Sequence, residues 1–295
     1  MNLSLDLEWM IQLCYNKAIR GQHMKKVICI TGGSSGFGYE TAKTLASKGH
    51  IVYAGARNID KMKSLETVGV HIRELNVTKE DSVQSFVDHI IKQEGRIDVL
   101  INNAVYGAYG VNETQSLKAI QAMYDVNVFG VIRMNQYVLP YMRKQRNGRV
   151  INIASLVSHI SLPGISHYAS TKHALRAMTE SLRSELKEFH INVIQIEPGA
   201  VNTGFEEVAL GLIEETQEDY QPFLSSFKTF IKKSYQKGKS PDSTVKAMVK
   251  ASLVKKPKWI YRTTLDAKVY PIMKTLFGIK LYSNIARNLI YKTKK

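Results

Sequence analysis

The chain has 295 residues, 44% of them hydrophobic, and a formal net charge of +16 at pH 7. A chain of this length can bury one substantial core, so we expect a single domain. Charged residues interrupt every long apolar stretch, which argues against a helix that spans a membrane. Asp6 and Glu8 precede the first apolar run, and no basic leader stands before it, so a signal peptide is not expected. We therefore predict a cytoplasmic protein.

The two cysteines and eight histidines form no pattern that is typical of a metal site. Cys29 lies in an apolar run that resembles a buried strand, where a thiol behaves as a small hydrophobe. Neither Cys-x-x-Cys nor His-Glu-x-x-His occurs in the chain. We predict no metal, and the few cysteines fit a reducing compartment.

The positive charge is concentrated in the C-terminal region. Residues 228–295 hold 18 Lys and Arg against two Asp, and the rest of the chain is balanced. Solvated surface lysines are the simplest interpretation, and contact with an anionic membrane surface is the main alternative. Specific nucleic-acid binding is not expected, because the excess is rich in Lys and no recognition motif accompanies it.

From Lys26 onward, short β-branched runs alternate with longer amphipathic stretches. This pattern is typical of parallel strands that helices cover on both faces. The predicted strands are Val27–Thr31, Ile51–Ala54, His71–Leu75, Val99–Asn102, Val150–Ala154 and Asn192–Ile196. The predicted helices, each long enough for a right-handed crossover, are Tyr39–Lys48, Asp81–Gln93, Ser116–Gln136 and Tyr168–Glu188. The sequence thus predicts an α/β fold, a doubly wound parallel sheet of the Rossmann type.

The two ends of this pattern are less regular. Residues 1–23 are expected to be an N-terminal extension, poorly packed or disordered, before a single domain over 24–295. Residues 205–240 mix aromatic and aliphatic residues with an acidic cluster, which predicts a helical substrate lid. Ser240-Pro241-Asp242 then begins a helix, with Ser as N-cap and Pro in the first helical position, that leads to a last strand at Trp259–Arg262. Residues 264–295 form a basic tail, predicted to be helical.

A glycine-rich segment, Thr31-Gly32-Gly33-Ser34-Ser35-Gly36-Phe37-Gly38, follows the first strand. At the start of a helix, such a loop lets the backbone approach a pyrophosphate while helix N–H groups face its charge. Arg57 stands just beyond the second strand, where a carboxylate would hold the ribose hydroxyls of NAD. A cation there favours the 2′-phosphate, so we predict NADP(H) as the cofactor. A solvent-exposed loop arginine is the alternative.

Ser155, Tyr168 and Lys172 follow the fifth strand at spacings of thirteen and four. Tyr168 and Lys172 share one helix face, so an ammonium can lie beside the phenol. Proton exchange with an alkoxide near neutral pH requires a phenol pKa lowered from about 10, and a nearby cation lowers it. Ser155 is placed to hydrogen-bond the substrate oxygen as negative charge develops there. These residues predict hydride and proton transfer between a nicotinamide and a carbonyl or alcohol.

These segments together resemble the classical short-chain dehydrogenase/reductase family over residues 25–290. The resemblance rests on the loop 31–38, Asn102-Asn103-Ala104, Asn127, Ser155, the Tyr-x-x-x-Lys pair and Pro198-Gly199. It implies that Lys172 also binds the nicotinamide ribose and that Asn127 holds a water that relays protons from Lys172. It implies that Val201 and Thr203 contact the carboxamide. The cofactor-binding residues it predicts are Gly32, Ser34, Ser35, Gly36, Phe37, Gly38, Arg57, Asn76, Val77, Asn103, Ala104, Tyr168, Lys172, Pro198, Gly199, Val201 and Thr203.

Two positions depart from the family pattern. Val105 stands where glycine usually follows Asn-Asn-Ala, which adds a side chain near the expected path of the cofactor ribose. Asn76 replaces a common Asp before Val77, and its amide can still donate to or accept from adenine.

Residues 181–186 and 265–268, together with Arg57, resemble the NADP-using branch that includes 17β-hydroxysteroid and retinol dehydrogenases. This resemblance implies a lipophilic alcohol or ketone that is steroid-, retinoid- or lipid-like, and the aromatic residues of 205–240 suit such a pocket. An oxoacyl-type reductase of the same family is an alternative. An NADP(H)-binding, membrane-associated regulator without turnover is an alternative of another class.

The basic tail spaces aliphatic residues among lysines and arginines over 269–290. Such a helix can lie on an anionic membrane surface, or it can pack on its own domain or on a partner subunit. The family resemblance implies a homodimer or homotetramer.

Overall fold

The computed structural model describes residues 25–214, 218–238 and 240–292. The predicted N-terminal extension, residues 1–23, lies outside the described residues. Cys29 is buried in the first strand, as predicted, and burial raises the pKa of its thiol.

The described residues form a seven-stranded parallel sheet in the order β3-β2-β1-β4-β5-β6-β7. The chain starts in the middle at β1, runs outward to β3, and then returns to the other side of β1 as β4. This arrangement confirms the doubly wound α/β fold. The strands are β1 (Val27–Thr31), β2 (Ile51–Ala56), β3 (Val70–Glu74), β4 (Val99–Asn102), β5 (Gly148–Ile153), β6 (Ile191–Glu197) and β7 (Ile260–Arg262).

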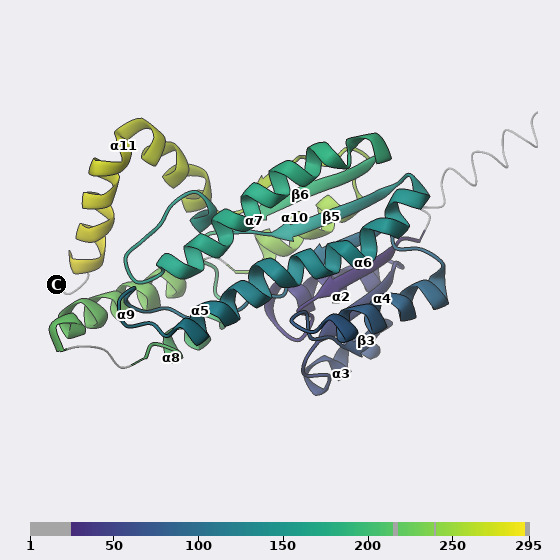
Figure 1. Ribbon diagram of the computed structural model, residues 1–295, viewed down its shortest axis with the longest axis horizontal. Coiled ribbons are helices and arrows are strands. Elements are labelled where there is room, and N and C mark those ends of the chain that lie inside the picture. Colours follow the sequence, from purple (N-terminus) through teal and green to yellow (C-terminus); the bar gives the residue numbers. More distant parts are fainter. Residues whose placement is uncertain (1–24, 215–217, 239, 293–295) are drawn as a thin grey trace, which may run out of the picture.

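Helices cover both faces of the sheet (Figure 1). One face packs on α2 (Gly36–Ser47), α3 (Lys63–Glu66) and α10 (Asp242–Leu253). The opposite face packs on α4 (Glu80–Glu94), α6 (Gly130–Gln145) and α7 (Ser166–Glu185). All five side chains of β1 are buried, because a central parallel strand has a helix layer on each side.

The predicted helix over Ser116–Gln136 is interrupted. Ser116 caps α5 (Leu117–Tyr124) by accepting from the Ala119 N–H, and a π-helical turn at Asp125–Phe129 joins α5 to α6. The amphipathic pattern of the sequence does not reveal the π turn. Its one extra residue rotates the following helix, but apolar and polar residues still alternate as they do in a continuous helix. Such turns are often found at functional sites, and this one contains Asn127.

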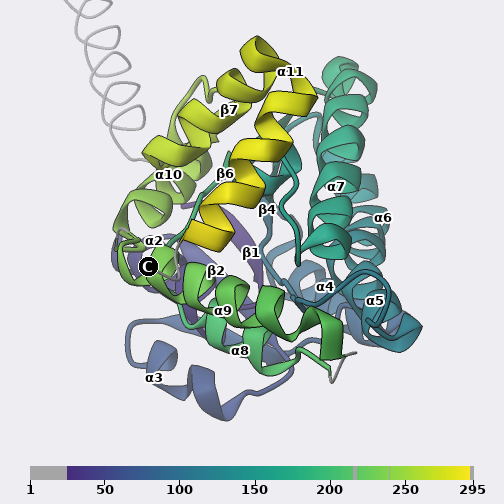
Figure 2. The same cartoon turned by 90° about the vertical axis from the view of Figure 1, so that its left-hand side faces the viewer.

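The region 205–240 is helical over its described residues, as α8 (Phe205–Gly211), a turn at Glu218–Tyr220 and α9 (Gln221–Gln236). Helix α9 packs against α11 (Leu265–Lys292), which bends at Gly278, where φ is 73° (Figure 2).

The predicted cap of α10 is shifted by one residue. Pro241 takes the N-cap position and Asp242 is the first helical residue. Ser240 Oγ nevertheless accepts from the Asp242 N–H at 3.3 Å, which is the contact that a capping serine makes. No described helix is long and apolar enough to cross a bilayer.

Candidate active site

A cavity of about 410 Å³ opens at the carboxyl ends of β1, β4, β5 and β6. A second cavity of about 480 Å³ shares Gly32, Ser34 and Arg57 with it and extends to the residues that follow β2 and β3. Strand order reverses between β1 and β4, and doubly wound sheets bind ligands at such a switch point. The two cavities therefore form one candidate cofactor cleft.

The glycine loop forms one wall of this cleft. Gly32 has a φ of 71°, and its N–H donates to the carbonyl of Gly55 at 2.8 Å. A Cβ on Gly32 would lie 2.8 Å from the Cα of Ala104, so only glycine fits. The Ser35 side chain does not cap α2, which leaves the first N–H groups of the helix available to an anion. The loop thus has the geometry of a pyrophosphate site.

The predicted loop residues divide into two groups. Gly38 lies behind the loop, where a Cβ would lie 2.3 Å from the carbonyl oxygen of Gly32. It therefore allows α2 to pack on the loop and does not line the cleft. The others line the first cavity: Gly32, Ser34, Ser35, Gly36 and Phe37.

Asn103 ties the end of β4 to the glycine loop. Its side-chain amide donates to the carbonyl oxygens of Thr31 and Gly32, both at 3.0 Å. The N–H groups of Asn103 and Ala104 both donate to Thr31 Oγ1, at 3.0 and 2.9 Å. The Asn103 amide is thus used to hold the loop, and residues 103 and 104 line the cavity beside it.

Arg57 follows β2 directly, and its exposed side chain lines both cavities. Lys61 also lines both, a second cation that no sequence motif indicated. Asn76 and Val77 line the second cavity. Asn76 Oδ1 accepts from the N–H and hydroxyl of Thr78 at 3.1 and 2.9 Å, so its Nδ2 is the atom left for a ligand. Within the described residues, no acidic side chain lines either cavity.

Tyr168 and Lys172 lie one turn apart on α7 and both line the first cavity. Lys172 Nζ lies 5.9 Å from the centre of the Tyr168 ring and donates to the carbonyl oxygen of Ile153 at 2.8 Å. Both side chains are buried, at 8% and 2% exposure. The structure therefore places the phenol and the amine side by side at the cleft that the glycine loop lines.

The electrostatics of this pair differ from the prediction. Burial raises the pKa of the Tyr168 phenol, and the neighbouring Tyr235 raises it further. Burial lowers the pKa of Lys172 to about 7, so this amine is only partly charged at neutral pH. Loss of hydration therefore outweighs the attraction that was expected to acidify the phenol. The protein groups keep Tyr168 protonated, the form that donates a proton to a carbonyl.

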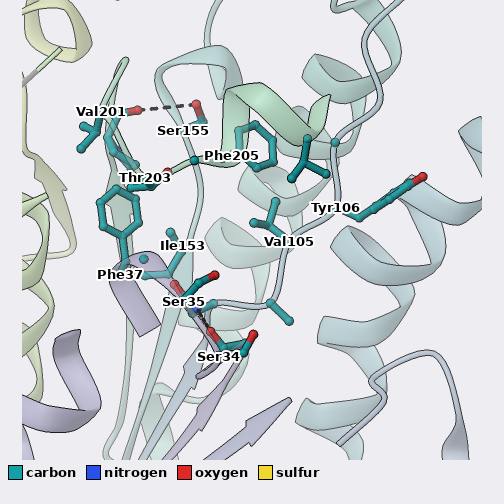
Figure 3. Close-up of a pocket in the computed structure, with 18 of the residues that line it drawn as sticks. Ser34, Ser35, Phe37, Val105, Tyr106, Ile153, Ser155, Val201, Thr203 and Phe205 are labelled. Carbon is teal, nitrogen blue, oxygen red and sulfur yellow. Dashed lines mark hydrogen bonds between the residues drawn. The ribbon is translucent and has the colours of Figure 1, made fainter. Parts of the chain in front are cut away.

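Ser155 lines the same cavity at the end of β5. Its hydroxyl accepts from the Val157 N–H at 3.3 Å and donates to the Pro198 carbonyl at 3.5 Å. Ser34 and Ser35 lie at one end of the cavity, and Ser155 lies at the other (Figure 3). The hydroxyl is placed where a substrate oxygen can meet it.

Asn127 is buried in the π turn and does not line either cavity. Its Oδ1 accepts from the Tyr106 N–H at 2.9 Å, and its Nδ2 donates to the Tyr106 carbonyl at 2.8 Å and to Thr171 Oγ1 at 3.1 Å. The side chain thus holds the cleft wall at Tyr106. The expected water relay to Lys172 stays a prediction.

The segment after β6 borders the first cavity on another side. The N–H of Gly199 donates to Thr264 Oγ1 at 2.9 Å, and that of Ala200 donates to Asp266 Oδ2 at 3.1 Å. A Cβ on Gly199 would lie 2.1 Å from a carboxylate oxygen of Asp266. The start of α11 therefore fixes this segment. The predicted cofactor residues here all line the cavity: Pro198, Gly199, Val201 and Thr203.

Aromatic side chains form the remaining part of the cavity wall. The ring of Phe205, from α8, lies 5.4 Å from that of Tyr168, and Tyr109 lies 5.8 Å from Tyr168. Tyr235, from α9, also lines the cavity. Sequence composition pointed to residues 205–240, which contain Phe205 and Tyr235, but it did not show which of their side chains face the cavity, because the helix faces could not be assigned. Val105, the departure from the family pattern, is 41% exposed and lines both cavities.

Comparison with known proteins agrees with this geometry. The family model for short chain dehydrogenase matches residues 26–210. The chain belongs to the short-chain dehydrogenase family. A 3-ketodihydrosphingosine reductase from Bacteroides thetaiotaomicron is 38% identical over 256 residues, which cover 86% of this chain and 91% of the relative. Retinol dehydrogenase 8 from Homo sapiens is 29% identical over 285 residues, 90% of this chain and 91% of the relative.

A solved short-chain dehydrogenase from Streptomyces avermitilis has the same fold. It superposes with a TM-score of 0.77 at 26% identity, over 90% of this chain and 99% of that one. The human relative is consistent with the predicted resemblance to the hydroxysteroid and retinol dehydrogenase branch. As a short-chain dehydrogenase, the protein is an oxidoreductase that acts on alcohol or carbonyl groups of small molecules with a nicotinamide cofactor.

Proposed function

We propose that this short-chain dehydrogenase uses NADP(H) and reduces a ketone of a lipophilic, steroid-, retinoid- or lipid-like substrate. The observation that carries the proposal is the position of Tyr168 and Lys172. They lie one helical turn apart in a single cavity that the glycine loop also lines. The phenol is therefore within the same space as the predicted cofactor site.

The proposed mechanism uses groups of this chain at each proton step. The glycine loop, Lys172 and residues 198–203 would hold a nicotinamide cofactor, which would supply the hydride and, in its oxidised form, a positive charge that favours the phenolate. Ser155 Oγ donates a hydrogen bond to the carbonyl oxygen as it becomes negative. The Tyr168 hydroxyl then gives its proton to that oxygen. The Lys172 amine is held by the Ile153 carbonyl. When this amine is protonated, its charge stabilises the resulting phenolate of Tyr168.

The preference for NADP(H) is supported by the charges around the cleft. Arg57 and Lys61 both line it, and no described acidic residue does. The 2′-phosphate of NADP(H) can pair with the two cations Arg57 and Lys61. The ribose hydroxyls of NAD would find no carboxylate to bind them. Lys61 adds a reason for NADP(H) that the sequence motifs did not contain.

The lipophilic substrate is supported by the aromatic wall and by the relatives. Phe205 lines the cavity, and its ring lies 6.2 Å from that of Tyr109, which in turn lies 6.0 Å from that of Phe227. A cavity with such a wall suits an apolar ligand that is oriented by a few polar groups. One relative is named for a 3-keto lipid and another for retinol. We therefore propose a long-chain or polycyclic ketone as substrate.

The test is NADPH oxidation with a panel of steroid, retinoid and long-chain ketones, measured for Tyr168→Phe and for Tyr137→Phe. Tyr137 lies on α6 and donates to Glu80, away from the cleft, so it is the matched control. Loss of the acid should reduce kcat by about a hundredfold or more, with NADPH affinity retained. Full turnover by Tyr168→Phe would rule out the mechanism. Tight NADPH binding without turnover of any ketone would favour the regulator.

We propose in addition that α11 makes a peripheral contact with an anionic membrane. Leu265, Val269, Ile272 and Leu276 recur on one side of the helix, and they are 69%, 38%, 55% and 73% exposed. Lys268 and Lys280 are exposed near them. An exposed apolar stripe with basic residues fits the boundary between acyl chains and anionic headgroups. A lipophilic ketone would be concentrated in the same membrane.

We propose a homodimer or homotetramer on the family resemblance. Light scattering of the purified protein measures the subunit number directly. A monomer at micromolar concentration would contradict this proposal without affecting the catalytic one.

A further inference from the structure

His159 follows Ser155 in the chain and lines neither cavity of the cleft. Its side chain is 10% exposed and lies between two charged groups. Arg176 Nη1, from α7, lies 2.8 Å from Nδ1, and Oε1 of Glu197, the last residue of β6, lies 2.7 Å from Nε2. A guanidinium can only donate a hydrogen bond, so Nδ1 accepts, and Nε2 carries the proton that is donated to the carboxylate. Each ring nitrogen of His159 thus joins it to a different element.

The carboxylate that His159 binds is itself held in place. Glu197 is fully buried, and Arg262 of β7 donates to its Oε2 at 2.9 Å. Gln195 Nε2 donates to Oε1, the same oxygen that accepts from His159. The next residue in the chain, Pro198, lines the first cavity. His159 is therefore attached to a fixed group directly beside the cavity wall.

The Pro198 carbonyl closes a ring of contacts that includes Ser155. It accepts from the Leu156 N–H at 2.8 Å and from the Ser155 hydroxyl at 3.5 Å. The second of these distances is long for a hydrogen bond between a hydroxyl and a carbonyl, so this contact alone holds the serine only weakly. The bond between His159 and Glu197 attaches the other end of the same turn to the same strand end.

The main chain of His159 is also held. Its N–H donates to the Leu156 carbonyl at 3.1 Å, and its carbonyl accepts from Lys274 Nζ of α11 at 2.8 Å. The turn after β5, the end of β6, α7 and α11 all contact this one residue. The turn that begins at Ser155 is therefore fixed at both of its ends.

We propose that His159 is a positioning residue, which sets the distance between the Ser155 hydroxyl and the segment 198–203. This proposal rests on the proposed function, in which Ser155 donates to the substrate oxygen and residues 198–203 help to hold the nicotinamide. Hydride transfer requires the carbonyl carbon to lie close to the nicotinamide while Ser155 binds the oxygen, so the relative position of these two groups affects the rate. The bond between His159 and Glu197 links the two peptides without occupying the cavity.

The experiment is a double-mutant cycle between His159 and Ser155. His159→Leu removes both ring contacts, and it should lower kcat for NADPH and a long-chain ketone by about tenfold. In the background of Ser155→Ala, the same substitution should lower kcat by less than about twofold, because no hydroxyl is left to misplace. His159→Gln keeps an N–H donor for Glu197 and should recover most of the wild-type kcat. A purely structural role for His159 would lower kcat by the same factor in both backgrounds.

Hydrogen exchange keeps the test independent of turnover. In His159→Leu, the amides of residues 155–158 should exchange faster, and the Leu156 N–H most of all, because its acceptor is the Pro198 carbonyl. The control is His173→Leu, another partly buried histidine, whose Nδ1 donates to the Ala169 carbonyl inside α7. It should leave these amides unchanged.

The outcomes separate this proposal from the proposed function. If the wild type reduces ketones and the substitutions at His159 and Ser155 act independently, or exchange is unchanged, the positioning role is wrong and the proposed function stands. If no ketone is reduced and exchange rises only in His159→Leu, the proposed function fails while His159 still positions the turn. Absence of turnover together with unchanged exchange would overturn both.

Discussion

The glycine loop and the α8–α9 region line the same cavity as Tyr168, yet they are built in different ways. Around the loop, backbone approaches backbone so closely that a Cβ on Gly32 or Gly38 would lie within 3 Å of a main-chain atom. Around α8 and α9, aromatic rings lie 5.4 to 6.2 Å apart, and one buried carboxylate oxygen, Oε2 of Glu206, has no hydrogen-bond partner within the described part of the chain. The close backbone contacts of the glycine loop allow only glycine at these positions. The substrate side is shaped by side chains, which other residue types can replace.

This difference matches the two tasks of the cleft. A nicotinamide cofactor has the same phosphates whatever the substrate, so its site can rely on backbone groups and glycines. A substrate pocket must distinguish one ketone from another, and it does so through shape and through a few polar groups. Substitutions on the two sides should therefore have different consequences.

The largest effect is expected at Gly38. Gly38→Ala places a Cβ 2.3 Å from the Gly32 carbonyl oxygen, so the loop or α2 must move. We expect a loss of about 2 to 3 kcal/mol in unfolding free energy, as for other overpacked sites, together with loss of NADPH binding. The matched control on the substrate side is Gly211→Ala in α8, where nothing lies within 4 Å. Urea unfolding and NADPH titration of both variants make the comparison, and equal behaviour would contradict it.

The second effect concerns Glu197, the buried last residue of β6. Burial favours a higher pKa, but hydrogen bonds and charges from His159 and Arg262 outweigh it, and the pKa falls below its ordinary 4.5. The folded-state pKa is lowered, so the charged carboxylate contributes stability above its unfolded pKa. That contribution is lost as the pH falls through the lower folded pKa.

Glu197→Gln should therefore cost about 2 kcal/mol at pH 7, since it leaves buried donors without their charged partner. The deficit relative to the wild type should shrink as the pH falls below 4.5. Glu180→Gln is the control, because its partner Arg176 and Glu180 itself are both partly exposed, at 36% and 47%. Urea unfolding from pH 7 down to the acid limit of folding tests both. A deficit that is constant with pH would contradict the assignment.

The third effect concerns Arg57. Arg57→Ala removes a cation that lines the cleft, so the Kd for NADPH should rise about tenfold and the Kd for NADH should stay within a factor of two. Lys63→Ala is the control, because Lys63 pairs with Asp60 and lines neither cavity. Fluorescence titration with both cofactors gives the two constants. Equal loss for NADPH and NADH would place Arg57 away from the 2′-phosphate.

The contrast between the glycine loop and the α8–α9 region also explains which features could be predicted from the sequence. The strands β1 and β4 have the predicted bounds, and the others differ by no more than two residues at either end. Buried parallel strands are continuous apolar runs between turns, which a sequence displays directly. The sequence also predicted that the glycine loop, Ser155, Tyr168 and Lys172 lie close together, and residues of all four line one cavity; their roles stay a prediction.

The sequence-based predictions failed where a residue's environment depends on its neighbours in space and not on the spacing of residues along the chain. The π turn at Asp125–Phe129 lies inside a continuous amphipathic pattern, so its extra residue could not be seen. The raised pKa of Tyr168 depends on burial by α8 and α9, which are distant in the sequence. Glu206 and Glu207 are equivalent as sequence letters, and only the packing of α8 buries one of them.

The smallest effect is expected at the surface of α11. Leu276→Ser should weaken binding to anionic vesicles by about fivefold, since a partly inserted leucine contributes about 1 kcal/mol. Leu117→Ser is the matched control: Leu117, at the start of α5, is 74% exposed and Leu276 is 73% exposed. The two helices occupy different parts of the surface (Figure 1). Co-sedimentation with anionic and with neutral vesicles measures the binding.

The comparison of Leu276→Ser with Leu117→Ser distinguishes a specific membrane-binding site from nonspecific hydrophobic adsorption. If α11 binds the membrane, only Leu276→Ser weakens sedimentation, and raising the salt concentration weakens it further, because exposed Lys268 and Lys280 lie near the stripe. If both leucines matter equally, the exposed apolar surface binds without a preferred site. If neither matters and Leu276→Ser changes the subunit number instead, another copy of the chain covers α11. Kinetics with a short, water-soluble ketone should be the same for both variants, because neither leucine lines the cleft.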